Sequence, residues 1–414
     1  MNMKYSIDNN FLLDSFFRYI SIDTTSDPSS SQTPSSPGQA VLARRLAEEL
    51  SSMGMEDVRL DDRSYLMAGL RSNTGSKEPT IGFISHLDTS PDMSGLGARP
   101  VIHENYGGGD LILNREKNIV MRVSDFPVLN QYRGQTLITS DGTSLLGADN
   151  KAGIAEIMTA LRFMARNPDL PRANIRVAFT PDEEIGRGAD FFNVEDFGAD
   201  FAYTVDGGGI GELQYENFNA AYAKIVISGR NIHPGDAFGK MINATRVGME
   251  LDSLLPGKER PEYTTGHEGF FHLYSFSAGV ETAVIEYIIR DHCSRGFDRR
   301  KEKMRQSVRL LNEKYGGVQL ELKDQYYNMA ARIKPVIHVV ELAKRAMEET
   351  GVRPVIKPIR GGTDGARLSF MGLPCPNIFC GGHNYHGRFE FIPSESMEKA
   401  SRVIVKIAEL AARG

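Results

Sequence analysis

The chain has 414 residues, of which 41% are hydrophobic and 24% are charged, so it is long enough to form two or three domains around sizeable cores. Its formal net charge of −5 offers no large basic surface to nucleic-acid phosphates. The sequence also contains no run of about 18 apolar residues, the length that a membrane helix needs. Nucleic acid and membranes are therefore not the expected partners.

The cysteines and the N-terminal sequence indicate a reducing compartment. Cys293, Cys375 and Cys380 form no CxxC pair and leave an odd count, which predicts free thiols. The N-terminal sequence has no basic region followed by a long apolar segment and no small-residue cleavage site. We therefore expect a cytoplasmic protein.

Strand and helix patterns alternate in the first part of the chain. An opening helix is followed by a Ser- and Pro-rich loop over residues 26–39 and by a helical pattern over residues 40–54. The next predicted elements are, in order, a strand at 80–86, a helix at 153–166, and strands at 174–179 and 200–205. This alternation is typical of an α/β fold, with a mainly parallel sheet flanked by helices.

The pattern changes at about residue 217. Strand, helix, two strands, helix and strand follow one another up to residue 327, and this βαββαβ order is typical of a ferredoxin-like sandwich. The first pattern then resumes, ending in a helix. We therefore expect a discontinuous catalytic domain over residues 1–216 and 328–414, with an inserted α+β ferredoxin-like lid domain over residues 217–327.

Acids or histidines stand near the end of each predicted strand of the larger domain. In an open α/β sheet, ligands bind outside the carboxyl ends of the strands, so such residues can converge from distant parts of the chain. Their conjunction predicts a metal site, although each motif alone is an ordinary loop. The residues are His86, Asp88, Asp149, Glu183, Glu184, Asp206 and His383.

The residue types of this set indicate the chemistry. Histidines and carboxylates without cysteine suit Zn, Mn or Co. Two metal ions would need a shared carboxylate, and together they could hold a hydroxide against a carbonyl group. Asp88 is a candidate to fix the tautomer of His86. Of Glu183 and Glu184, one could bind metal while the other faces the water, and the residues alone leave open which.

Five stretches resemble the co-catalytic dizinc M20 peptidases, namely SHLDTSPD, GADNKAG, TPDEEIGRG, YTVDGG and GGHNYHG. The resemblance runs from the N-terminal helix to the last of these stretches and includes the inserted domain. It implies that Asp149 bridges two zinc ions. One ion would also be held by His86 and Asp206, and the other by Glu184 and His383.

The resemblance also implies roles for the remaining acids. Asp88 would orient His86, and Glu183 would be the general base for attack of a zinc-polarised hydroxide on a peptide carbonyl. Two Zn²⁺ per subunit are expected, with Mn²⁺ or Co²⁺ as possible substitutes. The implied activity is release of the N-terminal residue from tripeptides.

Two other functions are alternatives to this one. The first is a carboxypeptidase or N-acyl amino acid amidohydrolase of the same family, which would keep the metal chemistry and change the substrate. The second is a non-catalytic binding protein on the same fold. A broken ligand set or a lost base would mark that second case, and here every position of the set is filled.

Three residues match family positions that contact the substrate. His233 in NIHPGDA matches the histidine that stabilises the oxyanion. Arg290 and Arg360 match positions where a guanidinium can hold a peptide carboxylate, and a salt-bridged strand end or a loop anchor is the alternative for each. The residues after Arg290 depart from the family pattern, which leaves the start of the next helix near Cys293 open. The resemblance also suggests a homodimer through the lid.

The other histidines carry weaker signals. His386 lies three residues after His383 and could compete with it as a ligand, but the family pattern favours His383, which leaves His386 as substrate-side or structural. His338 lies on an apolar helix face, typical of a packed core histidine. The remaining four have no partner signature in the sequence, namely His103, His267, His272 and His292.

Overall fold

The computed structural model describes residues 6–75 and 78–413. Residues 1–5, on which the expectation about a targeting segment partly rests, lie outside the described residues. The chain divides into two compact units. Unit 1 contains Met1–Tyr215, Ala331–Lys357 and Thr363–Gly414, and unit 2 contains Glu216–Ala330 and Pro358–Gly362.

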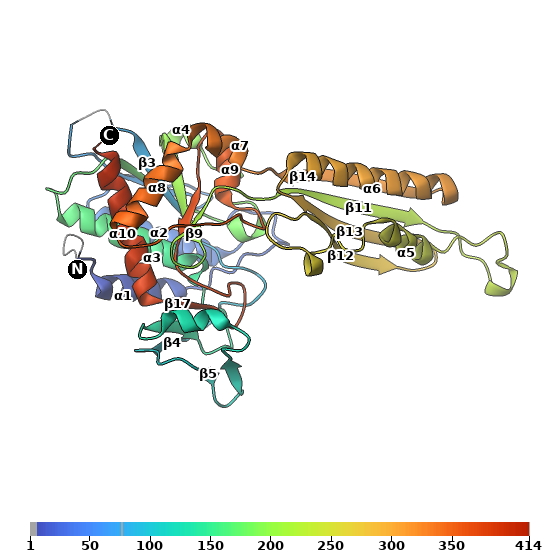
Figure 1. Cartoon of the computed structure of the whole chain (residues 1–414), viewed down its shortest axis with the longest axis horizontal. Helices are drawn as coiled ribbons and strands as arrows, with labels where there is room; N and C mark the ends of the chain where they lie inside the picture. Colours follow the sequence, from blue (N-terminus) through green and yellow to red (C-terminus); the bar gives the residue numbers. More distant parts are fainter. Residues whose placement is uncertain (1–5, 76–77, 414) are drawn as a thin grey trace. The chain divides into compact units, whose positions relative to one another are not determined.

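An eight-stranded sheet forms the centre of unit 1 (Figure 1). Its four central strands run parallel, and strands at its edges pair antiparallel, so the sheet is mixed with a parallel centre. This confirms the predicted α/β class. In order across the sheet, the strands are β1 (Glu56–Leu60), β2 (Leu66–Leu70), β8 (Asn174–Thr180), β3 (Thr80–His86), β9 (Phe201–Gly207), β16 (Asn377–Phe379), β10 (Glu212–Gln214) and β15 (Val355–Ile356).

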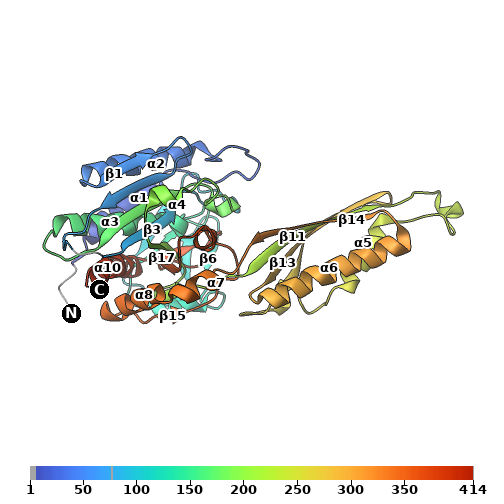
Figure 2. The same ribbon diagram turned by 90° about the horizontal axis from the view of Figure 1, so that it is seen from above.

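The central strands are buried on both faces, which explains their nearly continuous apolar sequences. In β3, every residue after Thr80 is buried. Helix α8 (His338–Glu349) buries one apolar stripe, with buried residues three or four positions apart at Val339, Ala343 and Met347, whereas α10 (Ser394–Ala411) is buried on most of its faces. Figure 2 shows α10 beside α8. The other helices of unit 1 include α1 (Asn9–Ile20), α2 (Pro37–Ser52), α3 (Ala148–Arg166), α4 (Val194–Phe197), α7 (Ala330–Ile333, whose first residue belongs to unit 2) and α9 (Asp364–Phe370).

Two small sheets, drawn mainly in teal in Figure 1, complete unit 1. They share an apolar cluster that includes Leu113, Met121, Tyr132 and Phe391. The sequence analysis did not predict them, because strands of three or four residues are too short to show a period of two. The strands are β4 (Pro100–His103), β7 (Leu137–Ser140) and β17 (Phe391–Pro393) in one sheet, and β5 (Leu111–Asn114) and β6 (Ile119–Met121) in the other.

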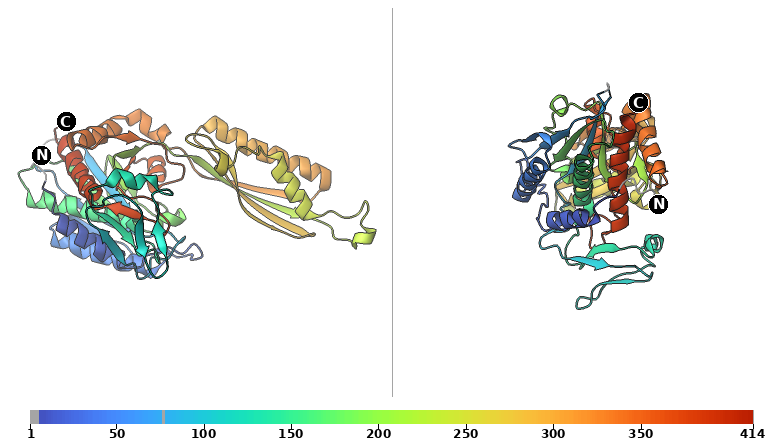
Figure 3. Two further views of the ribbon diagram at one scale, coloured as in Figure 1. Left: turned by 60° about the horizontal axis from the view of Figure 1, so that its bottom comes forward. Right: turned by 90° about the vertical axis from the view of Figure 1, so that its left-hand side faces the viewer.

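Unit 2 has the predicted βαββαβ order. Its antiparallel sheet has the strand order β12-β13-β11-β14, and both helices pack on one face of it (Figures 2 and 3). Alternate residues of the first strand, from Ala221 to Ile227, are buried against those helices. The elements are β11 (Asn219–Ser228), α5 (Ala244–Leu254), β12 (Phe270–Ala278), β13 (Thr282–Asp291), α6 (Ser294–Tyr315) and β14 (Val318–Tyr326).

The structure places one segment that the sequence did not, and it shows where helix α6 begins. The segment Pro358–Gly362 belongs to unit 2, because Ile359 forms a bridge with Asn217 and donates its N–H to the carbonyl of Glu216. The expected boundaries did not separate this segment. Helix α6 begins directly after Cys293, which is its N-cap.

Across residues 6–75 and 78–413, no helix is both long and apolar enough to cross a membrane.

Candidate metal centre

Strand ends of unit 1 bring the candidate residues together. His86 is the last residue of β3 and lies opposite Thr180, the last residue of β8. Glu183 and Glu184 follow β8 in a short 3-10 turn, and Asp206 is near the end of β9. Since these strands are parallel, their carboxyl ends lie at one edge of the sheet.

Asp149 lies at the centre of this group, in the first turn of α3. Its backbone has non-helical torsion angles (φ −85°, ψ 103°). Its Oδ1 lies 3.0 Å from His86 Nε2, and that nitrogen lies 3.4 Å from Asp206 Oδ1. Its Oδ2 lies 3.3 Å from His386 Nε2, which in turn lies 3.0 Å from Glu184 Oε2. The two oxygens of Asp149 thus face two separate groups of candidate metal ligands.

The histidine that lies next to Asp149 and Glu184 is His386, whereas His383, the expected ligand, contacts other residues. His383 Nε2 forms a hydrogen bond of 2.6 Å with Tyr132 Oη, and its ring stacks on Phe391 at 5.0 Å between centroids. Burial lowers the pKa of His383 to about 4, so its ring is neutral near pH 7. Asn384 and His386 both have positive φ, at 56° and 64°, and these turns direct His386 to the carboxylates.

Asp88 holds both the histidine and the glutamate pair. Its side chain is fully buried and accepts hydrogen bonds from the backbone N–H groups of Glu183 at 3.0 Å and Glu184 at 3.1 Å. His86 Nδ1 donates to the backbone carbonyl of Asp88 at 3.0 Å and lies 3.3 Å from Asp88 Oδ1. A hydrogen bond from Nδ1 fixes the tautomer of the ring, in which Nε2 carries no proton and can bind a metal ion. Asp88 thus contacts both His86 and the turn of the two glutamates, and its orienting role stays a prediction.

Two further acids support the site, and neither is evident from the sequence. Glu390 is fully buried and accepts hydrogen bonds from the N–H groups of Gly147 at 2.8 Å and Asp149 at 3.0 Å. Asp364 accepts from Thr180 Oγ1 at 2.9 Å, and its own N–H donates to Glu183 Oε1 at 3.3 Å. Neither acid follows a long strand, so only its distant partners reveal its place.

Crowding of these acids changes their protonation. Burial raises the pKa of Glu184 to about 7 and that of Asp206 to about 6, and it raises the pKa of Glu183 well above the usual range. Burial opposes the protonation of His86, but Asp206 and Asp149 raise its pKa well above normal. The pKa of Asp149 is lowered despite burial, because His386 and His86 both contact it. Burial and mutual repulsion therefore favour the protonated forms of Glu183, Glu184 and Asp206 more than in an exposed carboxyl group.

The side chains fit divalent cations on three counts. Carboxylates outnumber histidines, so a cation would relieve their repulsion. Glu184 Oε1 is buried without a hydrogen-bond partner. Within the described residues, His86, Asp149 and Glu184 have ligand atoms within 4.8 Å of one another, and so do His86, Glu183 and Asp206. Nitrogen and oxygen donors without sulfur suit Zn²⁺, Mn²⁺ or Co²⁺.

The three expected substrate residues all belong to unit 2. His233 is exposed, and its Nδ1 accepts from the N–H of Gly235. Arg290 donates to the carbonyl of Arg360 at 3.0 Å. Arg360 donates to three carbonyls of residues 264–268, which agrees with the loop-anchor alternative. Contact with substrate stays a prediction for each of the three.

Comparisons with known proteins identify relatives of the chain. The sequence matches the model of Peptidase family M20/M25/M40 over residues 145–410. It is 57% identical to peptidase T of Clostridium novyi (strain NT) over 401 residues, which cover 96% of this chain and 98% of that protein. The crystal structure of aminopeptidase PepT from Bacillus cereus ATCC 10987 is similar, with a TM-score of 0.78, 25% identity, and coverage of 98% of this chain and 99% of its own.

A second solved structure shares the fold at lower identity. It is the YXEP protein of Bacillus subtilis, described as a dinuclear metal binding peptidase from the M20 family. Its TM-score is 0.64 at 13% identity, and the match covers 98% of this chain and 99% of that one.

Proposed function

The chain belongs to the M20/M25/M40 peptidases, and from this premise we propose that it is a metal-dependent aminopeptidase that removes the N-terminal residue of tripeptides. The observation that carries the proposal is the Asp149 carboxylate, whose oxygens face two donor groups. Similarity over nearly the whole length to peptidase T, and to a structure described as an aminopeptidase, supports the choice of substrate end.

Two ligand sets follow from this proposal. His86, Asp149 and Asp206 would hold one ion. Asp149, Glu184 and His386 would hold the other, with His386 in place of His383. We take zinc as the ion at both positions, with Mn²⁺ or Co²⁺ as substitutes. When bound, such a pair supplies positive charge that polarises a peptide carbonyl and makes water a stronger acid.

Glu183 is the proposed general base. Burial raises the pKa of its carboxyl group well above the usual range, and a higher pKa makes the carboxylate a stronger base. The N–H of Asp364 fixes Oε1 of Glu183, and Asp88 fixes its backbone. Glu183 takes a proton from the water that attacks the peptide carbonyl and delivers it to the leaving amine.

Location and assembly complete the proposal. Cys293, Cys375 and Cys380 are free thiols in the structure, which supports the reducing cytoplasm. We also propose a homodimer through unit 2. Its edge strand β12 exposes the apolar side chains of Leu273, Tyr274 and Phe276. Light scattering coupled to gel filtration tests the dimer.

One experiment separates the proposed substrate from the alternatives. The zinc-loaded protein is incubated with an apolar tripeptide, free and N-acetylated, and with the matching dipeptide and tetrapeptide, and the products are identified by mass spectrometry. Release of the N-terminal residue from the free tripeptide alone is the expected result. Cleavage of the acetylated peptide, or release from the C-terminal end, would indicate the amidohydrolase or carboxypeptidase instead.

A further inference from the structure

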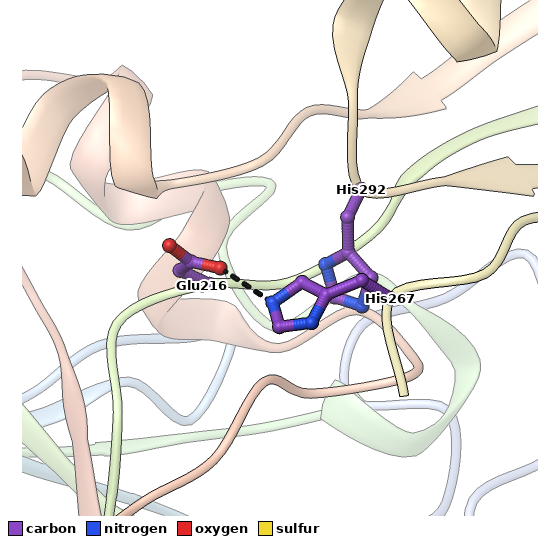
Figure 4. A group of neighbouring side chains, drawn as sticks. All are labelled: Glu216, His267 and His292. Carbon is purple, nitrogen blue, oxygen red and sulfur yellow. Dashed lines mark hydrogen bonds and ion pairs between the residues drawn. The ribbon is translucent and has the colours of Figure 1, made fainter. Parts of the chain in front are cut away.

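A second cluster of ligand-type side chains lies wholly within unit 2. It consists of Glu216, His267 and His292, which offer one ligand atom each, all within 4.8 Å of one another. Glu216 precedes β11, His267 lies in the loop before β12, and His292 follows β13 directly. Figure 4 shows the two imidazole rings next to each other, with the Glu216 carboxylate facing His267. The first and last of these residues, 216 and 292, are 76 positions apart in the sequence, and folding brings them together.

His292 points to a ligand, because it is buried without the partners that a buried imidazole needs. Only 7% of the residue is exposed, and neither Nδ1 nor Nε2 has a partner at hydrogen-bond distance and angle, although the backbone of Asn217 is close enough to affect the pKa of the ring. One ring face packs on Phe218 at 4.2 Å between centroids. Buried polar atoms in proteins are nearly always satisfied, so such an atom calls for an explanation by an ion or a water.

The two other residues complete a set of nitrogen and oxygen donors. His267 Nε2 lies 3.0 Å from Glu216 Oε2, and the rings of His267 and His292 lie 4.7 Å apart between centroids. The side chain of His267 is 62% exposed, which gives an ion a path from solvent. Two imidazoles and one carboxylate suit Zn²⁺ and related transition metals, and they do not suit Mg²⁺ or Ca²⁺, which prefer oxygen donors.

We propose that Glu216, His267 and His292 form a third metal site, which binds Zn²⁺ or a similar first-row divalent cation. It is separate from the centre at Asp149. Three protein ligands leave one tetrahedral position for water. The ion would join the start of β11, the loop before β12 and the end of β13, so its role is to stabilise unit 2.

The surrounding charges allow this site. Burial, followed by the nearby His267, lowers the pKa of His292 to about 4, although the backbone of Asn217 opposes the shift. The ring is therefore neutral near pH 7, the form that binds metal. The positive charge of Arg360 also lowers the pKa of His292, and the carboxylate of Glu216 raises it. Arg360 also donates to the carbonyls of Gly266 and Glu268, on both sides of His267, and so holds this loop in place.

The test counts bound zinc in the full-length protein. Wild-type protein and a His267→Ala variant are dialysed against the same free Zn²⁺ concentration, and zinc per chain is measured by elemental mass spectrometry. His272→Ala is the matched control, because His272 lies in unit 2 outside the cluster. Since only the difference between proteins is used, the result does not depend on how many ions the Asp149 centre binds.

Wild-type protein and His272→Ala are expected to bind about one zinc ion more per chain than His267→Ala. Glu216→Gln provides a second variant that leaves the buried His292 untouched, and it should lose the same ion. Hydrogen exchange of amides 264–268 should slow when zinc is added to wild-type protein and not when it is added to His267→Ala. Equal zinc content in all four proteins would overturn the proposal.

Discussion

The carboxylate of Asp88 accepts a hydrogen bond of 3.0 Å from the backbone N–H of Glu183. It therefore ties the end of β3 to the turn after β8, and the adjacent N–H of Glu184 binds the same carboxylate. This connection explains how two consecutive glutamates keep different directions. Asp88 fixes the backbone of Glu183 and Glu184. Their side chains then contact different groups, the N–H of Asp364 for Glu183 and His386 for Glu184.

Asp88→Asn should reduce metal affinity or kcat/KM by about 10- to 100-fold, the range found when a group that orients a ligand is lost. The amide keeps the size of the side chain, but its NH₂ group cannot accept a backbone N–H. Zinc content and peptide cleavage are the measurements. A wild-type kcat/KM together with wild-type zinc affinity would show that Asp88 positions neither His86 nor the glutamate turn.

Glu183→Ala and Asp149→Ala should fail in different ways. The first should keep its metal and lose turnover by roughly 100- to 10,000-fold, the usual contribution of a general base. The second should lose metal, because both donor groups depend on Asp149. Elemental analysis of both variants, beside their kcat, makes the comparison. Equal loss of metal from the two proteins would mean that their roles are assigned wrongly.

His386→Ala and His383→Ala test the choice between two histidines three residues apart. His386 lies 3.0 Å from Glu184 and 3.3 Å from Asp149, whereas His383 is bound to Tyr132. The His386 variant should bind about one ion less per chain, and the His383 variant should keep its ions. The opposite pattern of zinc content would restore His383 as the ligand.

Glu156 provides a test by pH. Both its carboxyl oxygens are buried without hydrogen-bond partners, and burial raises its pKa well above the ordinary 4.5. Above pH 4.5, Glu156 loses its proton in the unfolded chain but keeps it in the folded protein. The unfolded state then binds fewer protons, so this contribution to stability is present below pH 4.5 and is lost as the pH rises toward the folded pKa.

Glu156→Gln removes this titration. Relative to wild type, its free energy of unfolding should rise by roughly 1.4 kcal/mol per pH unit above the ordinary pKa, for as long as Glu156 stays protonated in the folded protein. Urea unfolding of both proteins at several pH values between about 4 and 8 gives the difference. A difference that does not change with pH would show that Glu156 is ionised in the folded state.

The sequence predicted those parts of the fold that repeat a pattern over many residues. The long strands β3, β8, β9 and β11 and the amphipathic helices show such patterns, because burial on one face repeats with the period of the element. Strands β4 and β17 have four residues or fewer and show none. Their absence from the prediction reflects their length.

The convergence of His86, Glu184 and Asp206 was predictable, because they lie at or just after the ends of strands of the parallel centre. The choice between His383 and His386 was not, because it depends on left-handed turns at Asn384 and His386 that no residue type requires. Asp364 and Glu390 were missed for a related reason. Their partners come from distant parts of the chain, and only the folded backbone brings them close.

The most direct test of the account measures peptide cleavage while metal is removed and restored. Purified protein is stripped with a chelator, and zinc is added back in steps while release of the N-terminal residue from a free tripeptide is followed by mass spectrometry. The stripped protein should cleave no peptide, and added zinc should restore cleavage in wild type but not in Asp149→Ala. Cleavage at an unchanged rate in the stripped wild-type protein would contradict a metal-dependent mechanism.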